Sequence, residues 1–350
     1  MTAGPFSEER FLLAVLRNCP PGNPGHLSTS RLLSLCRWHG VGPLVARALA
    51  EGHHRADIDA ELLTGLEALG RRTAGDNLLL LHRLGQLGQE LQSVGVRPML
   101  LKGTALLSIV YADPGLRPMA DADLLISASS WPRVLEALSA SGRYVLPSLQ
   151  RQQVALKYGY NLEIQTREAV PVTFEFHFKI RLWHHVLFDT DDVLRRGKPV
   201  ELAGREWLRM NDDDLLYHLC LHAAHHFFAP RLLWLYDLVL MHRKGCADWT
   251  RLRDRAGVNG FSVALGHTLK YLEKVFPGTV PAESIPHWGA VRMALFSVVR
   301  TSDPILPHRS LAGRVRRSFF MLVMVDHVMR LPGFLLGLAW HKLVRRLPSH

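Results

Sequence analysis

Cysteine is scarce and irregularly spaced in this sequence. The 350 residues contain four cysteines, Cys19, Cys36, Cys220 and Cys246, and no two of them form a CxxC pair. This spacing argues against both a zinc ribbon and a disulfide framework. The N-terminus also lacks the basic segment followed by an apolar segment that marks a secretory signal. We therefore expect a cytoplasmic protein.

Long apolar runs are missing as well. A transmembrane helix needs about 20 consecutive apolar residues. The C-terminal tail, residues 314–346, comes nearest, with apolar stretches at Phe319–Val325 and Phe334–Trp340 that polar residues and a proline interrupt. We favour two helices that pack on the body of the protein. A weak contact between this basic tail and a membrane surface and a single membrane span remain as alternatives.

Acidic residues are outnumbered by basic ones, 31 to 42, and the formal net charge is +11. A basic balance suits an anionic partner such as a nucleotide, a nucleic acid or a membrane surface, although an arginine-rich proteome produces it too. The sequence contains no phosphate-binding G-x-x-x-x-G-K-[ST] loop, no G-x-S-x-G turn and no HExxH motif. Charge alone therefore selects no function.

Hydrophobic periodicity divides the chain into three parts. Residues 1–95 are predicted to be helical, with a leucine stripe at positions 80, 84, 87 and 91 on one predicted helix, Asp76–Gln92. From Asp212 onward the pattern is helical again. Between them, residues 96–180 alternate short apolar runs with helix-like segments, which predicts a small α/β or α+β unit. Here a helix is predicted from Ala105 to Tyr111, and strand-like runs lie within 153–165 and 171–180. In the C-terminal part, one of the further helices is predicted near 291–299.

The most informative pattern is a pair of carboxylates on a predicted strand, Asp121–Ile126. Residues two apart on a strand point to the same side, so Asp121 and Asp123 project together. Such carboxylates repel each other unless a cation lies between them, and Mg²⁺ prefers oxygen ligands of this kind. Glu175 projects from a second alternating strand and would complete a metal site for phosphoryl displacement.

Lys102-Gly103-Thr104 lies between a short strand and a predicted helix. Glycine lets a backbone approach phosphate closely, lysine supplies a positive charge and threonine a hydroxyl. Arg117 adds a fork of donors for phosphate. A DxD pair alone is common on solvated strand faces. The order of these motifs is what makes a nucleotide site the favoured interpretation.

This order resembles the nucleotidyltransferase fold superfamily, to which DNA polymerase beta belongs, and more closely the uncharacterised nucleotidyltransferase family. The residues that carry the resemblance are Leu101–Gly103, Arg117, Asp121–Leu125, Phe174–His177, His218–His222 with His226, and Leu233–Leu238. The resemblance implies an α+β fold with a small mixed-sheet nucleotidyltransferase core, 96–180, embedded in helical N-terminal (1–95) and C-terminal (181–350) regions. The family pattern has Gly-Ser where this chain has Gly103-Thr104, which keeps the hydroxyl.

The resemblance also implies transfer of a nucleoside monophosphate from an NTP, such as ATP, to an acceptor, with release of pyrophosphate. Asp121, Asp123 and Glu175 would be the catalytic residues and the ligands of Mg²⁺ or Mn²⁺. The triphosphate would be bound by Lys102, Gly103, Thr104 and Arg117. The acceptor stays open: a small molecule, a peptide or protein, or, after these, RNA, because no aromatic–basic run of a single-strand binder is present.

Two alternatives remain open. The histidines at 218, 222, 225 and 226 recur along one predicted helix, where a zinc site is conceivable but a place beside the catalytic cleft is favoured. Asp237 is expected to buttress the contact between the helical half and the catalytic unit.

The competing function is a non-catalytic nucleotide-binding or membrane-associated scaffold with a degenerate nucleotidyltransferase fold.

Overall fold

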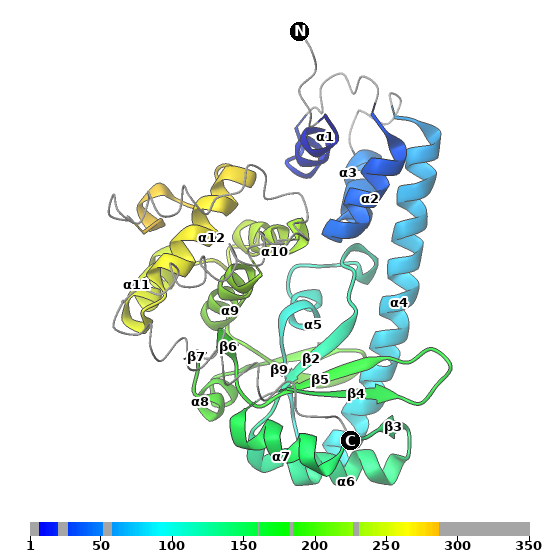
Figure 1. The fold of residues 1–350 in the computed structure, drawn as a ribbon, viewed down its shortest axis with the longest axis vertical. Coiled ribbons are helices and arrows are strands. Elements are labelled where there is room, and N and C mark those ends of the chain that lie inside the picture. The colour runs from blue at the N-terminus through cyan, green and yellow to red at the C-terminus, as the bar shows by residue number, and fades with distance from the viewer. Residues whose placement is uncertain are drawn as a thin grey trace.

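A long helix runs along one side of the fold and reaches a seven-stranded sheet (Figure 1). This computed structural model describes residues 7–19, 27–51, 58–159, 161–182, 185–226 and 231–286. Its helices are α1 (Ser7–Leu16), α2 (Thr29–His39), α3 (Gly42–Glu51), α4 (Ala60–Ser93), α5 (Lys102–Leu107), α6 (Trp131–Ser141), α7 (Leu149–Tyr158), α8 (Thr190–Arg195), α9 (Asp212–His225), α10 (Leu232–Arg243), α11 (Trp249–Asn259) and α12 (Ser262–Val275). Its strands are β1 (Met99–Leu100), β2 (Asp121–Leu125), β3 (Tyr144–Val145), β4 (Leu162–Thr166), β5 (Thr173–His177), β6 (Arg181–Leu182), β7 (His185–Val186), β8 (Lys198–Leu202) and β9 (Arg205–Arg209).

The main sheet has the strand order β3-β4-β5-β2-β1-β9-β8, and β6 and β7 pair separately. The pairs β2·β5 and β1·β9 are parallel, while the other neighbours in the main sheet are antiparallel. The predicted α+β class with a mixed sheet is thus confirmed. Two of its strands, β8 and β9, come from beyond residue 180, so the sheet extends past the predicted core. The domain boundaries themselves stay a prediction.

The helix α4 runs along the N-terminal helices and reaches the sheet (Figure 1). Asp59 begins it by accepting a hydrogen bond from the backbone N–H of Glu61, which satisfies one free donor of the first turn. The predicted leucine stripe is confirmed, because Leu80, Leu84, Leu87 and Leu91 are all buried. Burial of each such side chain stabilises the fold by about 1.5–3 kcal/mol.

Strand β5 shows the alternation that its sequence predicts. Phe174 and Phe176 are fully buried, and the ring of Trp131 on α6 meets Phe176 edge-on at a centroid distance of 5.8 Å. Glu175 and His177 lie on the opposite face and are half-buried. A slip of one residue would exchange these two faces, so the aromatic core fixes the register of the strand.

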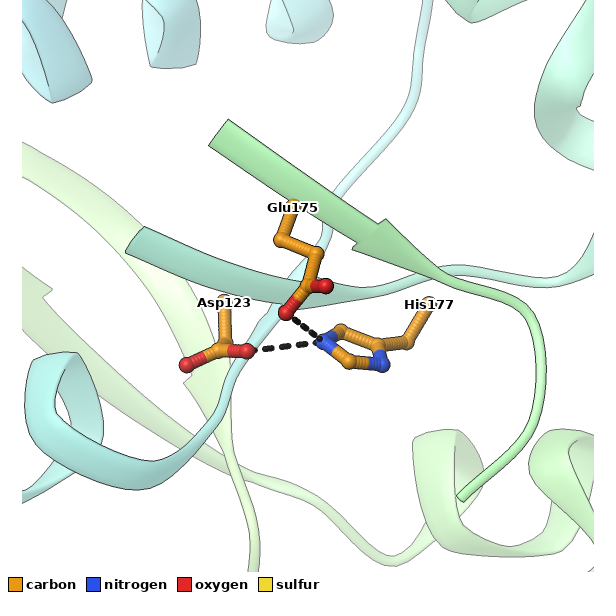
Figure 2. Close-up of side chains that lie close together, drawn as sticks. All are labelled: Asp123, Glu175 and His177. Atoms are coloured by element: carbon orange, nitrogen blue, oxygen red, sulfur yellow. Dashed lines mark hydrogen bonds and ion pairs between the residues drawn. The ribbon is translucent and has the colours of Figure 1, made fainter. Parts of the chain in front are cut away.

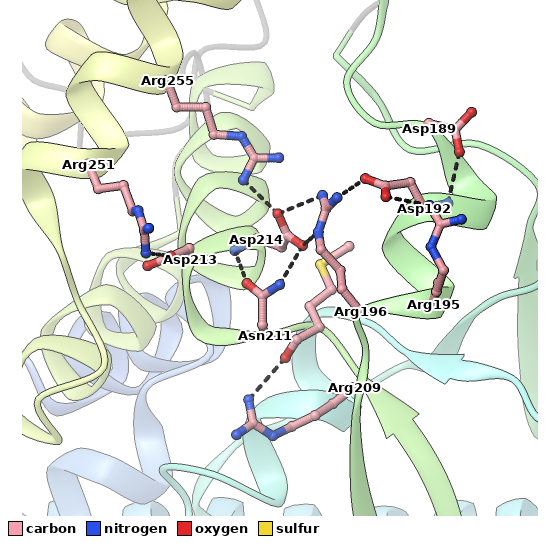
Figure 3. A network of polar contacts seen from close by, with 11 residues as sticks. Asp189, Asp192, Arg195, Arg196, Arg209, Asn211, Asp213, Asp214, Arg251 and Arg255 are labelled. Atoms are coloured by element: carbon pink, nitrogen blue, oxygen red, sulfur yellow. Dashed lines mark hydrogen bonds and ion pairs between the residues drawn. The ribbon is translucent and has the colours of Figure 1, made fainter.

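The first turn of α9 is held by ion pairs with two other helical segments (Figure 3). The buried carboxylate of Asp214 accepts hydrogen bonds from Arg196, just after α8, at 2.6 Å and from Arg255 on α11 at 2.6 Å. Asn211 caps the helix by accepting from the N–H of Asp214. An acidic side chain also suits the positive end of the helix dipole. These contacts fix where α9 begins relative to α8 and α11.

Two sequence expectations differ from the structure in detail. Of the strand predicted within 153–165, only Leu162–Thr166 is a strand, because Ser148 caps a helix that starts at Leu149 and Gly159, at φ 67°, ends it. The helix predicted from Ala105 to Tyr111 starts three residues earlier, at Lys102, and ends at Leu107. The helix expected near 291–299 and the tail 314–346 lie outside the described residues. Within the described part of the chain, every helix is too short or too polar to cross a membrane.

Candidate active site

The predicted acidic residues meet at the centre of the sheet. Strands β2 and β5 pair in parallel with Asp123 opposite Glu175 and Asp121 opposite Thr173. Asp121, Asp123 and Glu175 therefore share one face of the sheet, since side chains alternate along a strand. The other face of β2, with Ala122 and Leu124, is fully buried. The pairing of two distant segments thus brings the three carboxylates together.

Lys102 places a positive charge among these carboxylates. Its Nζ donates a hydrogen bond to Asp123 Oδ1 at 2.6 Å and lies 3.8 Å from Glu175 Oε2. Lys102 has a φ of 44°, an uncommon value for a residue other than glycine, at the junction where β1 turns into α5. Such a conformation costs about 1–3 kcal/mol and clusters at functional sites. It directs the lysine onto the acidic pair.

His177 is the site residue that the sequence prediction did not include. Its Nε2 lies 2.7 Å from Asp123 Oδ1 and 3.1 Å from Glu175 Oε2 (Figure 2). The signal was present in the sequence, because His177 follows Glu175 by two residues on an alternating strand and so shares its face. The predicted set of site residues includes only Glu175 from that strand.

The charges of the cluster shift one another's pKa values. Burial raises the pKa of Asp121 to about 6, and the negative charge of Asp123 adds to this shift. Burial also acts to raise the pKa of Asp123, but Lys102 and His177 overcome it, so that pKa lies well below its ordinary value. Burial opposes the charges of Lys102 and His177, yet the carboxylates raise the pKa of each. The ammonium group of Lys102 thus compensates part of the negative charge of Asp123 and Glu175, and the imidazole of His177 lies within hydrogen-bond distance of both carboxylates.

The donor set fits a divalent metal ion. Within the described residues, Asp123, Glu175 and His177 form the one group of ligand-type side chains whose donor atoms all lie within 4.8 Å of one another. Carboxylate oxygens and an imidazole nitrogen are common ligands of divalent cations. Asp121 lies outside this group, although it shares the sheet face. Its predicted role as a metal ligand stays a prediction.

The residues predicted to bind phosphate are engaged within the protein. The hydroxyl of Thr104 donates to the carbonyl oxygen of Leu101 at 2.8 Å. The buried guanidinium of Arg117 donates twice to Asp237, from Nε to Oδ1 at 3.0 Å and from Nη2 to Oδ2 at 2.7 Å. Gly103 lies directly beside this guanidinium, and a Cβ there would be 2.2 Å from Arg117 Nη1. Contact of these three residues with phosphate stays a prediction.

Asp237 joins the helical half to the catalytic unit, as expected from its position. It lies on α10, is 1% exposed, and accepts hydrogen bonds from Arg117 and from the hydroxyl of Tyr111. A buried pair of this kind is costly to break, because removal of one partner leaves an uncompensated charge. The structure therefore supports the predicted buttress.

His218 and His222 of α9 are near enough to the acidic cluster to interact with the charges of Lys102 and Asp123. His218 is buried, and neither of its ring nitrogens has a hydrogen-bond partner among the described residues. Burial, followed by the charge of Lys102, lowers the pKa of His218 to about 3. His222, one turn further, packs edge-on against Trp234 at a centroid distance of 5.1 Å. Among the described histidines of this row, no group has the spacing of a metal site.

Comparison with known proteins agrees with this arrangement. The family described as uncharacterised nucleotidyltransferase matches residues 26–277, which include the acidic cluster and helices α9 to α12. No curated protein and no solved structure matches the chain. Since the match spans most of the 350 residues, the chain belongs to the uncharacterised nucleotidyltransferase family.

Proposed function

We propose that this protein is a divalent-metal-dependent nucleotidyltransferase, which moves a nucleoside monophosphate from an NTP to an acceptor hydroxyl. The observation that carries the proposal is the parallel pairing of β2 with β5, which sets Asp123 opposite Glu175. Lys102 is hydrogen-bonded to Asp123 and lies within ion-pair distance of Glu175. Family membership supports the general class of reaction. The metal, the nucleotide and the acceptor are parts of the proposal.

We assign Asp121, Asp123 and Glu175 to Mg²⁺ or Mn²⁺. When bound, the ion would neutralise charge on the phosphates and align the attacking and leaving oxygens. Lys102 is the phosphate-binding cation of this proposal, because its ammonium group is partly buried beside the carboxylates. Gly103 and Arg117 then shape the turn that carries Lys102, since Arg117 is paired with Asp237.

The reaction is a displacement at the α-phosphorus of the NTP. The acceptor oxygen forms a bond to this phosphorus as the bond to the bridging oxygen of the β-phosphate breaks. Pyrophosphate leaves with the electron pair, and the acceptor proton passes to the carboxylate nearest the acceptor, acting as general base. The acceptor is a small molecule or a peptide or protein, and RNA is the less favoured candidate. Helices α9 and α10 would select the acceptor.

Calorimetric titration with each NTP, in the presence of Mg²⁺ or Mn²⁺, tests the proposal. The variant is Asp121→Asn/Asp123→Asn, and the matched control removes two carboxylates that are 62% and 63% exposed, Asp76→Asn/Asp254→Asn. We expect metal-dependent binding by the wild type and the control. The site variant should bind at least about 100-fold more weakly, since metal-mediated contacts contribute several kcal/mol.

A pyrophosphate-release assay with candidate acceptors follows. Release by the wild type and the control, but not by the site variant, is the result expected of an enzyme. If the folded wild type binds no NTP with either metal, the enzyme proposal is wrong, and the non-catalytic scaffold takes its place. NTP binding with no pyrophosphate release from any acceptor class would favour the nucleotide-binding form of that scaffold. Membrane contact through the tail remains a separate prediction.

A further inference from the structure

We propose that His177 is a direct metal ligand together with Asp123 and Glu175. The site then binds a first-row transition-metal dication, such as Mn²⁺, more tightly than Mg²⁺. This inference rests on the proposed function, because it concerns the metal of the same site. It replaces an all-carboxylate ligand set by one with two carboxylates and an imidazole.

The spacing of the three side chains suits coordination without movement of the backbone. His177 Nε2 is 2.7 Å from Asp123 Oδ1 and 3.1 Å from Glu175 Oε2. Two donor atoms at right angles on an ion, each at about 2.1 Å, lie about 3 Å apart. The two separations from His177 Nε2 therefore match those of neighbouring ligands, and the third, between Asp123 and Glu175, is within 4.8 Å. Asp121 lies on the same face of the sheet, but it does not belong to the group whose donor atoms lie within 4.8 Å of one another.

The register of the sheet explains why His177 reaches the same point as two acids. Asp123 is paired with Glu175 across β2 and β5, and His177 is the next residue of β5 on that face. The aromatic residues on the other face, Phe176 among them, hold this register through burial. The imidazole is thus positioned by the same core that positions Glu175.

A second observation on a different element points to a ligand here. His218 on α9 is 6% exposed, and both of its ring nitrogens lack a hydrogen-bond partner within the described residues. Helix α9 packs against α5, whose first residue is Lys102, so His218 lies on an element that borders the cluster. An unsatisfied buried polar group costs about 1–3 kcal/mol. A metal-bound water or an acceptor hydroxyl would supply the missing hydrogen bond.

The imidazole decides the type of metal. Mg²⁺ prefers oxygen ligands and keeps several waters, whereas first-row transition-metal dications accept imidazole nitrogen more readily, with Mn²⁺ the weakest binder of that series and therefore the strictest test. A site that draws one of its three protein ligands from His177 therefore discriminates against Mg²⁺. Lys102 opposes any ion in the nucleotide-free protein, because its ammonium group is bonded to Asp123 Oδ1. Removal of that charge should strengthen metal binding.

Direct metal binding tests the inference without reference to activity. The chelator-treated full chain is titrated with Mn²⁺ without nucleotide, and free Mn²⁺ is measured by electron paramagnetic resonance, with Mg²⁺ as competitor. The variants are His177→Gln and Lys102→Met. The matched control is His82→Gln, which removes an exposed imidazole on α4. Circular dichroism and the thermal midpoint verify that each variant is folded.

We expect one Mn²⁺ per wild-type chain, bound more tightly than Mg²⁺. His177→Gln should weaken Mn²⁺ binding at least about tenfold, since even loss of a group that only orients a ligand costs about 10–100-fold in affinity. Its affinity for Mg²⁺ should change by less than about twofold, because an amide oxygen suits Mg²⁺. Lys102→Met should bind Mn²⁺ more tightly, and His82→Gln should match the wild type.

A measurement on the wild type alone covers the case in which His177→Gln does not fold. Pulsed electron paramagnetic resonance of the Mn²⁺-loaded protein should show hyperfine coupling to an imidazole nitrogen. Equal Mn²⁺ affinity of the wild type and His177→Gln, tighter binding of Mg²⁺, or absence of this nitrogen coupling would overturn the inference. NTP binding with Mg²⁺ that Asp121→Asn/Asp123→Asn abolishes would then still support the proposed function.

Discussion

An added methyl group at Gly103 would collide with a buried ion pair. A Cβ there would lie 2.2 Å from Arg117 Nη1 and 3.2 Å from Met119 Sδ. Arg117 has little freedom to move, because two hydrogen bonds hold it to Asp237. We expect Gly103→Ala to lower the free energy of unfolding by about 2–4 kcal/mol. This range joins the cost of overpacking, about 1–3 kcal/mol, with that of breaking a buried ion pair, about 3–5 kcal/mol.

Urea unfolding, followed by circular dichroism, measures this change against a matched control. Gly75 lies inside α4, and a Cβ there would meet nothing within 4 Å. Gly75→Ala makes the same chemical change without the collision, and it should raise the free energy of unfolding by about 0.5–1 kcal/mol, as alanine favours a helix over glycine. The two glycine substitutions are thus expected to have opposite signs.

The cause of the loss is tested by removal of the ion pair. In an Arg117→Ala/Asp237→Ala background, the added methyl group has room, and we expect Gly103→Ala to cost less than about 1 kcal/mol. The difference between the two backgrounds is the coupling energy of the contact, about 0.5–3 kcal/mol for residues that touch. An equal cost in both backgrounds would refute the reasoning. Lost NTP binding at unchanged stability would instead show that the glycine serves phosphate, as the sequence predicts.

Two further predictions concern acid stability and thiol reactivity. Burial opposes the negative charge of Asp214, but Arg196 and Arg255 lower the pKa of this carboxylate below its ordinary value. The ionised carboxylate therefore stabilises the fold fully above about pH 4, and this stabilisation is lost as the pH falls through the lowered pKa. The thermal midpoint of Asp214→Asn should therefore depend less on pH between 3 and 5 than that of the wild type, and parallel curves would contradict this. Burial raises the pKa of Cys36 to about 12, whereas Cys19 is exposed. Iodoacetamide at about pH 8 should label Cys19 in the folded protein and Cys36 only in urea, since the thiolate is the reactive form; mass spectrometry that finds Cys36 labelled in the folded protein would refute this.

Local patterns predicted those parts of the fold in which local rules decide the outcome. The leucine stripe of α4 and the alternation in β5 follow from side-chain periodicity, and both are confirmed. The parallel pair β1·β9 joins Met99 to Leu208, and no local pattern encodes a contact between segments so far apart. The sequence predicts a strand-like run within 153–165, and this prediction is wrong for residues 153–158, which belong to helix α7. Its caps at Ser148 and Gly159 settle the matter.

The same division applies to the candidate site. Strand geometry placed Asp121 and Asp123 on one side, and the structure shows them on one face of the sheet with Glu175. His177 was open to the same reasoning, since it alternates with Glu175. The same reasoning cannot identify the partner of Arg117, because Asp237 is 120 residues away in the sequence. Whether the guanidinium binds a phosphate or a carboxylate depends on the packing of the folded chain. The residue type of Arg117 indicates a fork of hydrogen-bond donors, but it does not indicate which group accepts those bonds.

Helices α10 and α11, which both pack against α9, each take part in an ion pair. Arg117 and Asp237 join the segment before β2 to α10, while Asp214 with Arg255 joins the first turn of α9 to α11. Helix α9 also packs against α5, the helix that begins at Lys102, so His218 lies on an element that borders the candidate site. Ion pairs of this kind add little net stability compared with apolar packing, but they fix one arrangement. Within the described residues, this arrangement leaves both ring nitrogens of the buried His218 without a hydrogen-bond partner, so the imidazole is available to a ligand of the proposed active site.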